Sequence, residues 1–246
     1  MEQRTRYQKI ILAILAAMTA VFLALLIYNR TQPGIQFRDA FLKQHINGEI
    51  TTYSGRCKGK NLAIITAPVT GGTAVSFTSG SGDWGFDYVV SEWNDGGKRP
   101  YDKAVVVTDD LGAVLFRGYL TENGYLLDEN GELEWDEWGF STITYGYEWQ
   151  DEWEDYEPSM STIAELGTQP DLVRRGSIGL FVMMVFAALT MALDVLFPKL
   201  FFQLQHFLSV RDPEPSDFYI ATQRIGWAVW PVLLAVGYGF AATCLP

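Results

Sequence analysis

The sequence predicts an α+β membrane protein with three transmembrane helices and one soluble, antiparallel β-rich domain, arranged as a meander, a sandwich or a partial barrel. Three long apolar runs recur along the 246 residues, and each is close to the roughly 20 residues that a helix needs to cross a bilayer. The block between the first two runs is rich in Val, Ile, Thr and aromatic residues in short segments. Such segments, separated by turn residues, are typical of β-strands.

The acidic residues of the chain are concentrated in the β-rich block. Residues 29–173 hold 24 acidic and 10 basic residues, within a chain whose formal net charge is −11. An acidic block of this size repels phosphate backbones, so nucleic acid is not an expected partner.

The first apolar run, Ile10 to Tyr28, contains no charged residue and follows Arg4, Arg6 and Lys9. It is longer than the apolar region of a cleavable signal peptide, and no small-x-small site follows it. We therefore expect residues 1–28 to form a tail and an uncleaved transmembrane helix.

The soluble domain is expected over residues 29–157. Its first part, Ile35–Ile46, has apolar residues at mixed helical spacing before Asn47-Gly48, which predicts a short helix with a C-terminal stop. From Glu49 onward, Asn-Gly and Asp-Gly pairs are typical of tight hairpin turns between strands. The expected strands are Ile50–Lys58, Leu62–Ala67, Ala74–Thr78, Phe86–Trp93, Lys103–Thr108, Ala113–Leu120, Tyr125–Leu127 and Ser141–Trp149.

Residues 158–177 are predicted to be a tether. They contain Pro158, Gly167 and Pro170 among several Ser and Thr residues, a composition typical of loops. We expect at most one short turn in it, around Ile163–Leu166.

Residues 178–246 are predicted to form a helical hairpin of two transmembrane helices. The first, Ile178–Phe197, ends before Pro198 and contains Asp194. An ionisable group within a span is a functional candidate. The alternative is that Asp194 lies near enough to the interface to be hydrated or to pair with Lys199.

The rest of the hairpin begins with Lys199–Val210, which has the helical spacing of a short interfacial helix. The last span is expected over Ile225–Cys244. Trp227, Trp230 and Tyr238 are expected to anchor it at the two interfaces.

A Pro-rich acidic connector joins the two spans. We expect Ser216 to cap the last helix and Asp217 to complement its positive start. Its residues are Asp212, Pro213, Glu214, Pro215, Ser216 and Asp217.

The stretch Val210–Ile220, together with Gln223–Gly226, resembles a small bacterial membrane family of unknown function. That family has a two-helix module with a Glu-Pro-Ser-Asp connector, and the resemblance covers the C-terminal quarter of the chain. It implies a bacterial cell-envelope protein, and it brings no reaction, cofactor or active-site residue.

Basic residues predict the orientation. Two spans separate the N-terminal tail from the connector, so both lie on one side of the membrane. Three basic residues in the tail, and Lys199, Arg211 and Arg224 around the connector, favour the cytoplasm for that side. We therefore predict a multi-pass cell-membrane protein with a cytoplasmic N-terminus and an extracytoplasmic β domain, although Arg30, Arg174 and Arg175 oppose this.

The candidate binding region is Asp128–Glu157, which holds twelve carboxylates and no Lys or Arg. The carboxylates could bind Ca²⁺, or the aromatic rings could stack on sugars or engage a basic peptide or a cationic head group. The alternative is a final strand, Ser141–Trp149, with packed tryptophans on one face and solvated acids beyond it. The candidate residues are Trp135, Asp136, Glu137, Trp138, Trp149, Asp151, Glu152 and Trp153.

No sequence motif indicates catalysis. The chain has two cysteines, Cys57 and Cys244, and no CxxC or GxSxG motif. We predict a binding, sensing or accessory subunit without a cofactor, whose partners are the lipid bilayer and another membrane or envelope protein. The alternatives are a membrane-anchored hydrolase that uses the clustered carboxylates, and a small transporter or channel component.

Overall fold

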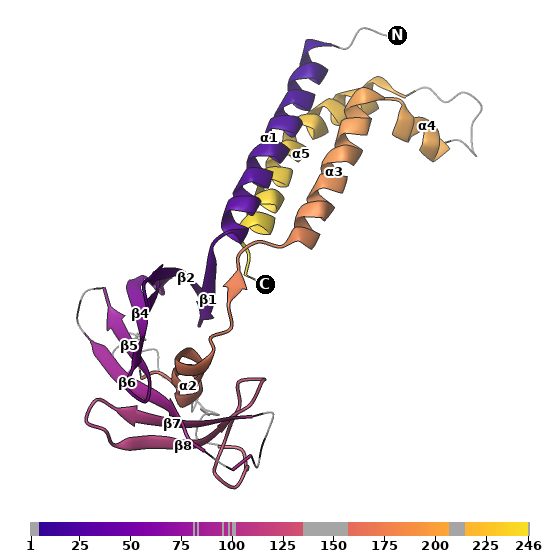
Figure 1. Ribbon diagram of the computed structural model, residues 1–246. Coiled ribbons are helices and arrows are strands. Elements are labelled where there is room, and N and C mark those ends of the chain that lie inside the picture. The colour runs from indigo at the N-terminus through magenta and orange to yellow at the C-terminus, as the bar shows by residue number, and fades with distance from the viewer. Residues whose placement is uncertain are drawn as a thin grey trace, which may run out of the picture. The chain divides into compact units, whose positions relative to one another are not determined.

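The computed structural model describes residues 5–134 apart from 81, 83, 95, 98, 100 and 101, together with residues 157–206 and 215–245. The chain divides into two compact units. The helical unit consists of Met1–Pro33 and Val173–Pro246, and the β unit of Gly34–Leu172. Each unit has a hydrophobic cluster of its own, and the elements of both are labelled in Figure 1.

The β unit contains one antiparallel sheet in which each strand pairs with the next along the chain. The antiparallel β domain is therefore confirmed, and its strand order is that of a meander. Figure 1 shows the sheet curving around one helix, α2 (Met160–Thr168). The strands are β1 (Pro33–Phe37), β2 (Ala40–Asn47), β3 (Ile50–Cys57), β4 (Lys60–Val69), β5 (Gly72–Ser79), β6 (Gly85–Glu92), β7 (Lys103–Asp109), β8 (Val114–Leu120) and β9 (Leu126–Leu127).

The core of the β unit follows from the two-residue period of its strands. In β4, Leu62 and Ile64 are buried while their neighbours are more exposed, and Val75 and Phe77 repeat this pattern in β5. Alternation of this kind places every second side chain on one face of the sheet. α2 covers that face with Ile163, which is fully buried in the same cluster.

The short helix expected over Ile35–Ile46 is wrong. This stretch forms β1 and β2, which pair with each other around a turn in which Arg38 has a φ of 51°. Asn47-Gly48 is the turn between β2 and β3, where Gly48 has a φ of 63°. The pair is as suited to a hairpin as to a helix end, so the local signal alone did not decide between them.

Residues 160–168, expected within a tether, form α2. Ser159 caps this helix by accepting a hydrogen bond from the backbone N–H of Thr162 at 3.4 Å. Gly167 packs closely on the sheet, since a Cβ atom there would lie 2.4 Å from the Cβ of Val90. A segment with the composition of a loop is thus held in the core by a few apolar residues and one glycine.

The helical unit contains three helices long and apolar enough to cross a membrane. Only 17–28 % of the most apolar stretch of each is buried. These helices are α1 (Arg6–Arg30), α3 (Ile178–Leu196) and α5 (Asp217–Thr243), and the unit also contains β10 (Val173–Arg174) and α4 (Leu200–His206).

Hydrogen bonds between the helices define two ends of this bundle. At one end, the side chain of Gln8 on α1 donates to the carbonyl of Val195 on α3 at 2.9 Å. At the other, Asn29 donates to the carbonyl of Ala242 at 2.7 Å. The start of α1 and the segment after α3 therefore lie at the same end.

Two of the aromatic residues expected at membrane interfaces lie inside the bundle instead. Trp227 and Tyr238 are both buried. The Tyr238 hydroxyl shares a hydrogen bond of 3.1 Å with Thr19 of α1. Trp230 is exposed, as an interfacial anchor would be. The difference arises because α5 packs on both α1 and α3. Composition alone does not predict which face of α5 makes these contacts.

Candidate functional site

The candidate site begins with Asp194, in the last turn of α3. This helix is otherwise composed of apolar residues, Gly and Thr, and it ends at Leu196, just before Phe197-Pro198. Proline has no backbone N–H and restricts the residue before it, so a helix commonly stops there. The position of Pro198 thus places the carboxylate close to one end of the bundle.

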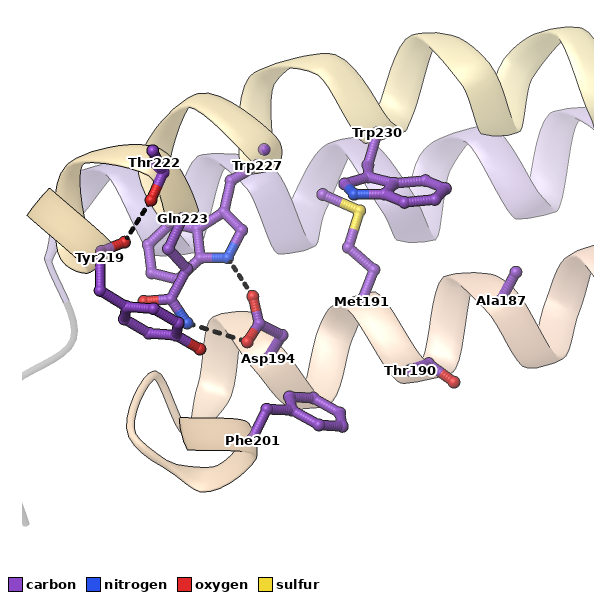
Figure 2. Close-up of a pocket in the computed structure, with 11 residues that line it drawn as sticks. Ala187, Thr190, Met191, Asp194, Phe201, Tyr219, Thr222, Gln223, Trp227 and Trp230 are labelled. Atoms are coloured by element: carbon purple, nitrogen blue, oxygen red, sulfur yellow. Dashed lines mark hydrogen bonds between the residues drawn. The ribbon is translucent and has the colours of Figure 1, made fainter. Parts of the chain in front are cut away.

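The partners of Asp194 come from one face of α5. Gln223 and Trp227 are four residues apart and so project from the same side of the helix. The amide nitrogen of Gln223 donates to Oδ1 of Asp194 at 2.8 Å, and the indole nitrogen of Trp227 donates to Oδ2 at 2.6 Å. Both carboxylate oxygens therefore accept a hydrogen bond from α5, as Figure 2 shows.

The start of α5 is held as the sequence predicted. The hydroxyl of Ser216 accepts a hydrogen bond from the backbone N–H of Tyr219 at 3.2 Å, and Asp217 lies in the first turn. The capping role of Ser216 is confirmed. Pro215 lies just before the cap, whereas Asp212, Pro213 and Glu214 lie outside the described residues.

A cavity of about 610 Å³ opens beside the carboxylate. This is a typical volume for a small-molecule site. Its wall combines aromatic and small side chains with four hydroxyl or amide groups (Figure 2). The lining residues are Ala187, Thr190, Met191, Asp194, Phe201, Tyr219, Thr222, Gln223, Gly226, Trp227 and Trp230.

A second cavity, of about 440 Å³, lies at the same end of the bundle and shares Gln223 and Trp227 with the first. It contains two basic residues, Lys199 and Arg224. A carboxylate and two cations therefore occupy neighbouring cavities. The expected alternative of an Asp194–Lys199 pair does not occur: Asp194 bonds to Gln223 and Trp227.

The chemistry of the cavity follows from the groups that line it. The titratable groups that line the cavity are the carboxylate of Asp194 and the phenol of Tyr219. The two Thr hydroxyls of the cavity both donate to backbone carbonyls of their own helices. A single carboxylate, held by two donors and faced by aromatic rings, can attract and orient a cationic group.

The acidic candidate region falls almost wholly outside the described residues. Trp135, Asp136, Glu137, Trp138, Trp149, Asp151, Glu152 and Trp153 all lie there, as does the strand expected over Ser141–Trp149. Their proposed binding role stays a prediction.

The described beginning of that region is a turn around Asp128. One oxygen of Asp128 accepts from the backbone N–H groups of Asn130 at 2.9 Å and Glu132 at 2.8 Å. These bonds, chiefly that from Glu132, lower the pKa of the Asp128 carboxyl. Within the described part of the chain, no group of three or more His, Cys, Asp or Glu residues could hold a metal ion.

Sequence reasoning found part of the site in the helical unit. Asp194 stands out as a charge in an apolar run, whereas Gln223 is part only of the segment that carries the family resemblance, and Trp227 was predicted to lie at the interface. The available signal was the four-residue spacing of Gln223 and Trp227 on a helix that could face Asp194. The sequence does not predict the contacts of Gln223 and Trp227 with Asp194, because these depend on which face of α5 packs against α3 in the tertiary structure.

The fold and this site define a chain with a β domain and three helices apolar enough to cross a membrane. Residues 178–243 match a family model described as a family of unknown function (DUF6199), which confirms a resemblance to an uncharacterised family in the C-terminal quarter. The matched segment runs from the start of α3 to the end of α5 and includes the whole lining of the first cavity. No curated protein and no solved structure matches this chain.

Proposed function

We propose that this chain is a three-span membrane protein that displays its acidic β domain outside the cytoplasm and acts by binding, as an accessory or sensing subunit. The observation that carries this is the apolar exterior of α1, α3 and α5. Exposed contiguous apolar surface of this extent needs hydrocarbon or protein around it. The β unit, in contrast, buries its apolar residues in a core of its own.

The distribution of basic residues supports a cytoplasmic location for the end of the bundle that includes Gln8 and Pro198. Arg6 and Lys9 lie at the start of α1, and Lys199 and Arg224 lie at the connector. Loops rich in Lys and Arg remain in the cytoplasm. At the other end, Arg30 and Arg175 of the opposing arginines donate hydrogen bonds to backbone carbonyls.

Both hydrogen bonds are made by guanidinium groups. A guanidinium nitrogen of Arg30 donates to the carbonyl of Gly176 at 3.0 Å, and the Nε of Arg175 donates to the carbonyl of Thr243 at 3.2 Å. Thr243 is the last residue of α5. Arg175 is therefore a cation at the C-terminus of α5, where it offsets unpaired carbonyls and the negative end of the helix dipole whichever side it faces. The contact of Arg30 instead joins the end of α1 to the segment before α3.

The charge of the β domain supports a basic partner. Twelve carboxylates without an intervening Lys or Arg occupy Asp128–Glu157, and a concentration of negative charge accelerates encounter with positively charged proteins. We assign the binding role to this region and propose that its partner is a basic segment of another membrane or envelope protein.

Cysteine labelling tests the orientation. In a Cys244→Ser background, Leu111→Cys places a thiol on a β-unit turn that is 88 % exposed, and Lys199→Cys places one at the connector. An impermeant thiol reagent should label Leu111→Cys in intact cells, and Lys199→Cys only after permeabilisation. Cys57 is fully buried and should stay silent in both. The reverse pattern would place the β domain in the cytoplasm.

Binding is tested with full-length protein in a nonionic detergent and an oligolysine peptide as the probe. The variant Asp136→Asn, Glu137→Gln, Asp151→Asn, Glu152→Gln should lose affinity by at least about tenfold. The matched control neutralises four acids elsewhere in the β unit: Asp39→Asn, Glu49→Gln, Asp87→Asn and Glu92→Gln. Equal losses in both variants would show attraction by net charge alone and contradict a defined binding region.

A further inference from the structure

The first cavity of the helical unit contains a carboxylate whose charge is not balanced by a neighbouring cation. Among the described residues, no Lys, Arg or His nitrogen lies within ion-pair distance of Asp194, and the two side chains that donate hydrogen bonds to it, Gln223 and Trp227, are neutral. A carboxylate within an apolar bundle is costly and normally has an opposing charge or water. The site is therefore electrostatically suited to a cationic ligand.

The hydrogen-bonding groups around Asp194 show what kind of cation fits. An ionised carboxylate offers about four acceptor positions, and the α5 donors occupy one on each oxygen. The amide nitrogen of Gln223 donates both to Asp194 and to the carbonyl of Pro198, at 2.8 and 2.9 Å. Its two N–H groups are thereby used, and its side-chain oxygen is left as an acceptor.

The threonines of the wall add acceptors rather than donors. The hydroxyl of Thr190 donates to the carbonyl of Phe186 at 2.9 Å, and that of Thr222 to the carbonyl of Phe218 at 2.9 Å. A hydroxyl has a single hydrogen, so each oxygen can only accept from a ligand. The oxygens of Thr190, Thr222 and Gln223 are thus acceptors beside the carboxylate. This set is complementary to a group with several N–H donors, such as a primary ammonium.

Aromatic side chains complete the complementarity. Phe201, Tyr219 and Trp230 line the cavity with Asp194 (Figure 2). Aromatic faces attract cations through the ring quadrupole, by up to about 2 kcal/mol where water is excluded. The remaining wall, which includes Ala187 and Met191, is apolar and can accommodate hydrocarbon.

The neighbouring cavity supplies the opposite charge. It shares Gln223 and Trp227 with the first and contains Lys199 and Arg224. Arginine and lysine are the usual protein partners of phosphate. A ligand that engages both cavities must carry an ammonium and a phosphate, and a membrane-facing, apolar wall favours one that also carries acyl chains.

We propose that this end of the helical unit binds a phospholipid with a primary ammonium head group, phosphatidylethanolamine, with its ammonium on Asp194 and its phosphate directed to Lys199 and Arg224. A choline head group lacks the N–H donors that the acceptor wall requires. A serine head group adds a carboxylate that this wall would repel. The inference rests on the proposal that the helical unit lies in a membrane.

Native mass spectrometry of the full-length protein, released from a nonionic detergent, tests the proposal. The protein is mixed with equal amounts of phosphatidylethanolamine, phosphatidylcholine, phosphatidylserine and phosphatidylglycerol with the same acyl chains. We expect one adduct, of phosphatidylethanolamine, to exceed each of the others by about tenfold. Equal adducts of all four lipids, or a preference for the choline or glycerol head group, would overturn it.

Variants locate the lipid. Asp194→Asn should reduce the phosphatidylethanolamine adduct about tenfold relative to phosphatidylglycerol, whereas Asp217→Asn, the same change outside the cavity, should not. Retention of the preference in Asp194→Asn would reject the assigned role of the carboxylate.

A second variant keeps the test decisive if Asp194→Asn misfolds. Gly226 lines the cavity and has ordinary van der Waals space for a Cβ, whose nearest neighbour would be Trp230 at 3.7 Å. Gly226→Leu should fill the cavity and abolish the adduct, while Gly179→Leu, on α3 and outside the cavity lining, should leave it. An unchanged adduct in Gly226→Leu would exclude this cavity as the site.

Extraction of membranes with alkaline carbonate separates the two proposals. If the wild-type chain stays in the membrane pellet but shows no head-group preference, the lipid site is refuted and the three-span arrangement stands. If the chain is extracted, the three-span arrangement is refuted as well.

Discussion

Phenylalanine occupies opposite environments in the two units: Phe77 of β5 is fully buried, whereas Phe186 of α3 is 65 % exposed. The same contrast holds for aliphatic residues. Ile64 is fully buried in the β unit, while Val182 and Leu189 face outward from α3. The β unit is therefore folded as in water, with its apolar residues inside. The helical unit presents apolar residues on both its inner and outer faces, as a bundle surrounded by hydrocarbon does.

Polar groups differ between the units in a complementary way. Most of the acidic side chains in the described part of the β unit are exposed to water. In the helical unit, polar side chains bridge helices, as Gln8 does to Val195 and Trp227 does to Asp194. Without water as an alternative partner, such groups must be satisfied within the bundle. Asp194 is therefore the most informative polar group of the helical unit, because its carboxylate is hydrogen-bonded by neutral donors alone.

Truncating one phenylalanine in each unit would test the comparison most strongly. Phe77→Ala removes a ring from a closed core and should destabilise the β unit by about 3–5 kcal/mol. Phe186→Ala is the matched control, and it should change stability by less than about 0.5 kcal/mol because its ring contacts the surroundings. Native-state hydrogen exchange of the full-length protein in detergent would measure both. Similar effects would mean that Phe186 is buried by a partner.

A charge placed on an exposed apolar residue in each unit sharpens the comparison. Leu189→Arg, near the middle of α3, should disfavour membrane insertion by about 2.5–3.5 kcal/mol, since arginine is poorly accommodated at the centre of a span. Leu111→Arg, on a turn of the β unit, should have an effect within about 0.5 kcal/mol. The fraction of protein resistant to carbonate extraction reports the first, and thermal unfolding the second. Full insertion of Leu189→Arg would show that this face meets water or protein.

The smallest expected effect concerns pH in the β unit. Hydrogen bonds from Glu132 and Asn130 lower the pKa of the exposed Asp128 carboxyl. Because the pKa is lowered on folding, this carboxylate stabilises its turn at all pH values above the ordinary Asp range, and the stabilisation is lost as pH falls through the lowered pKa. The amide proton of Glu132 should therefore titrate in an NMR experiment with a midpoint below the ordinary pKa of an Asp carboxyl.

The controls for this titration are both in the same loop region. Asp128→Asn should remove it, whereas Glu122→Gln should leave it unchanged. A midpoint at or above the ordinary value for Asp would contradict the hydrogen-bonded turn.

The sequence predicted most of the β strands because each carries its own signal. β3 to β9 follow the expected segments closely, since alternation of apolar and polar residues and Gly-containing turns act over a few residues. β1 and β2 were missed because Asn47-Gly48 ends either a helix or a strand equally well. α2 was missed because its helical pattern is a single short stretch whose stability comes from packing Ile163 against the sheet rather than from local propensity.

By itself, the sequence determined the three apolar helices, the antiparallel β domain, the cap at Ser216 and the presence of an ionisable group at Asp194. These depend on length, periodicity and local hydrogen bonding, all of which are encoded by neighbouring residues. Only the tertiary structure decided that Gln223 and Trp227 bind Asp194, that Trp227 and Tyr238 lie inside, and that a carboxylate and two cations line adjoining cavities. Those facts depend on which face α5 turns towards α3 and α1, and that choice is made by packing between segments about 30 residues or more apart in the chain.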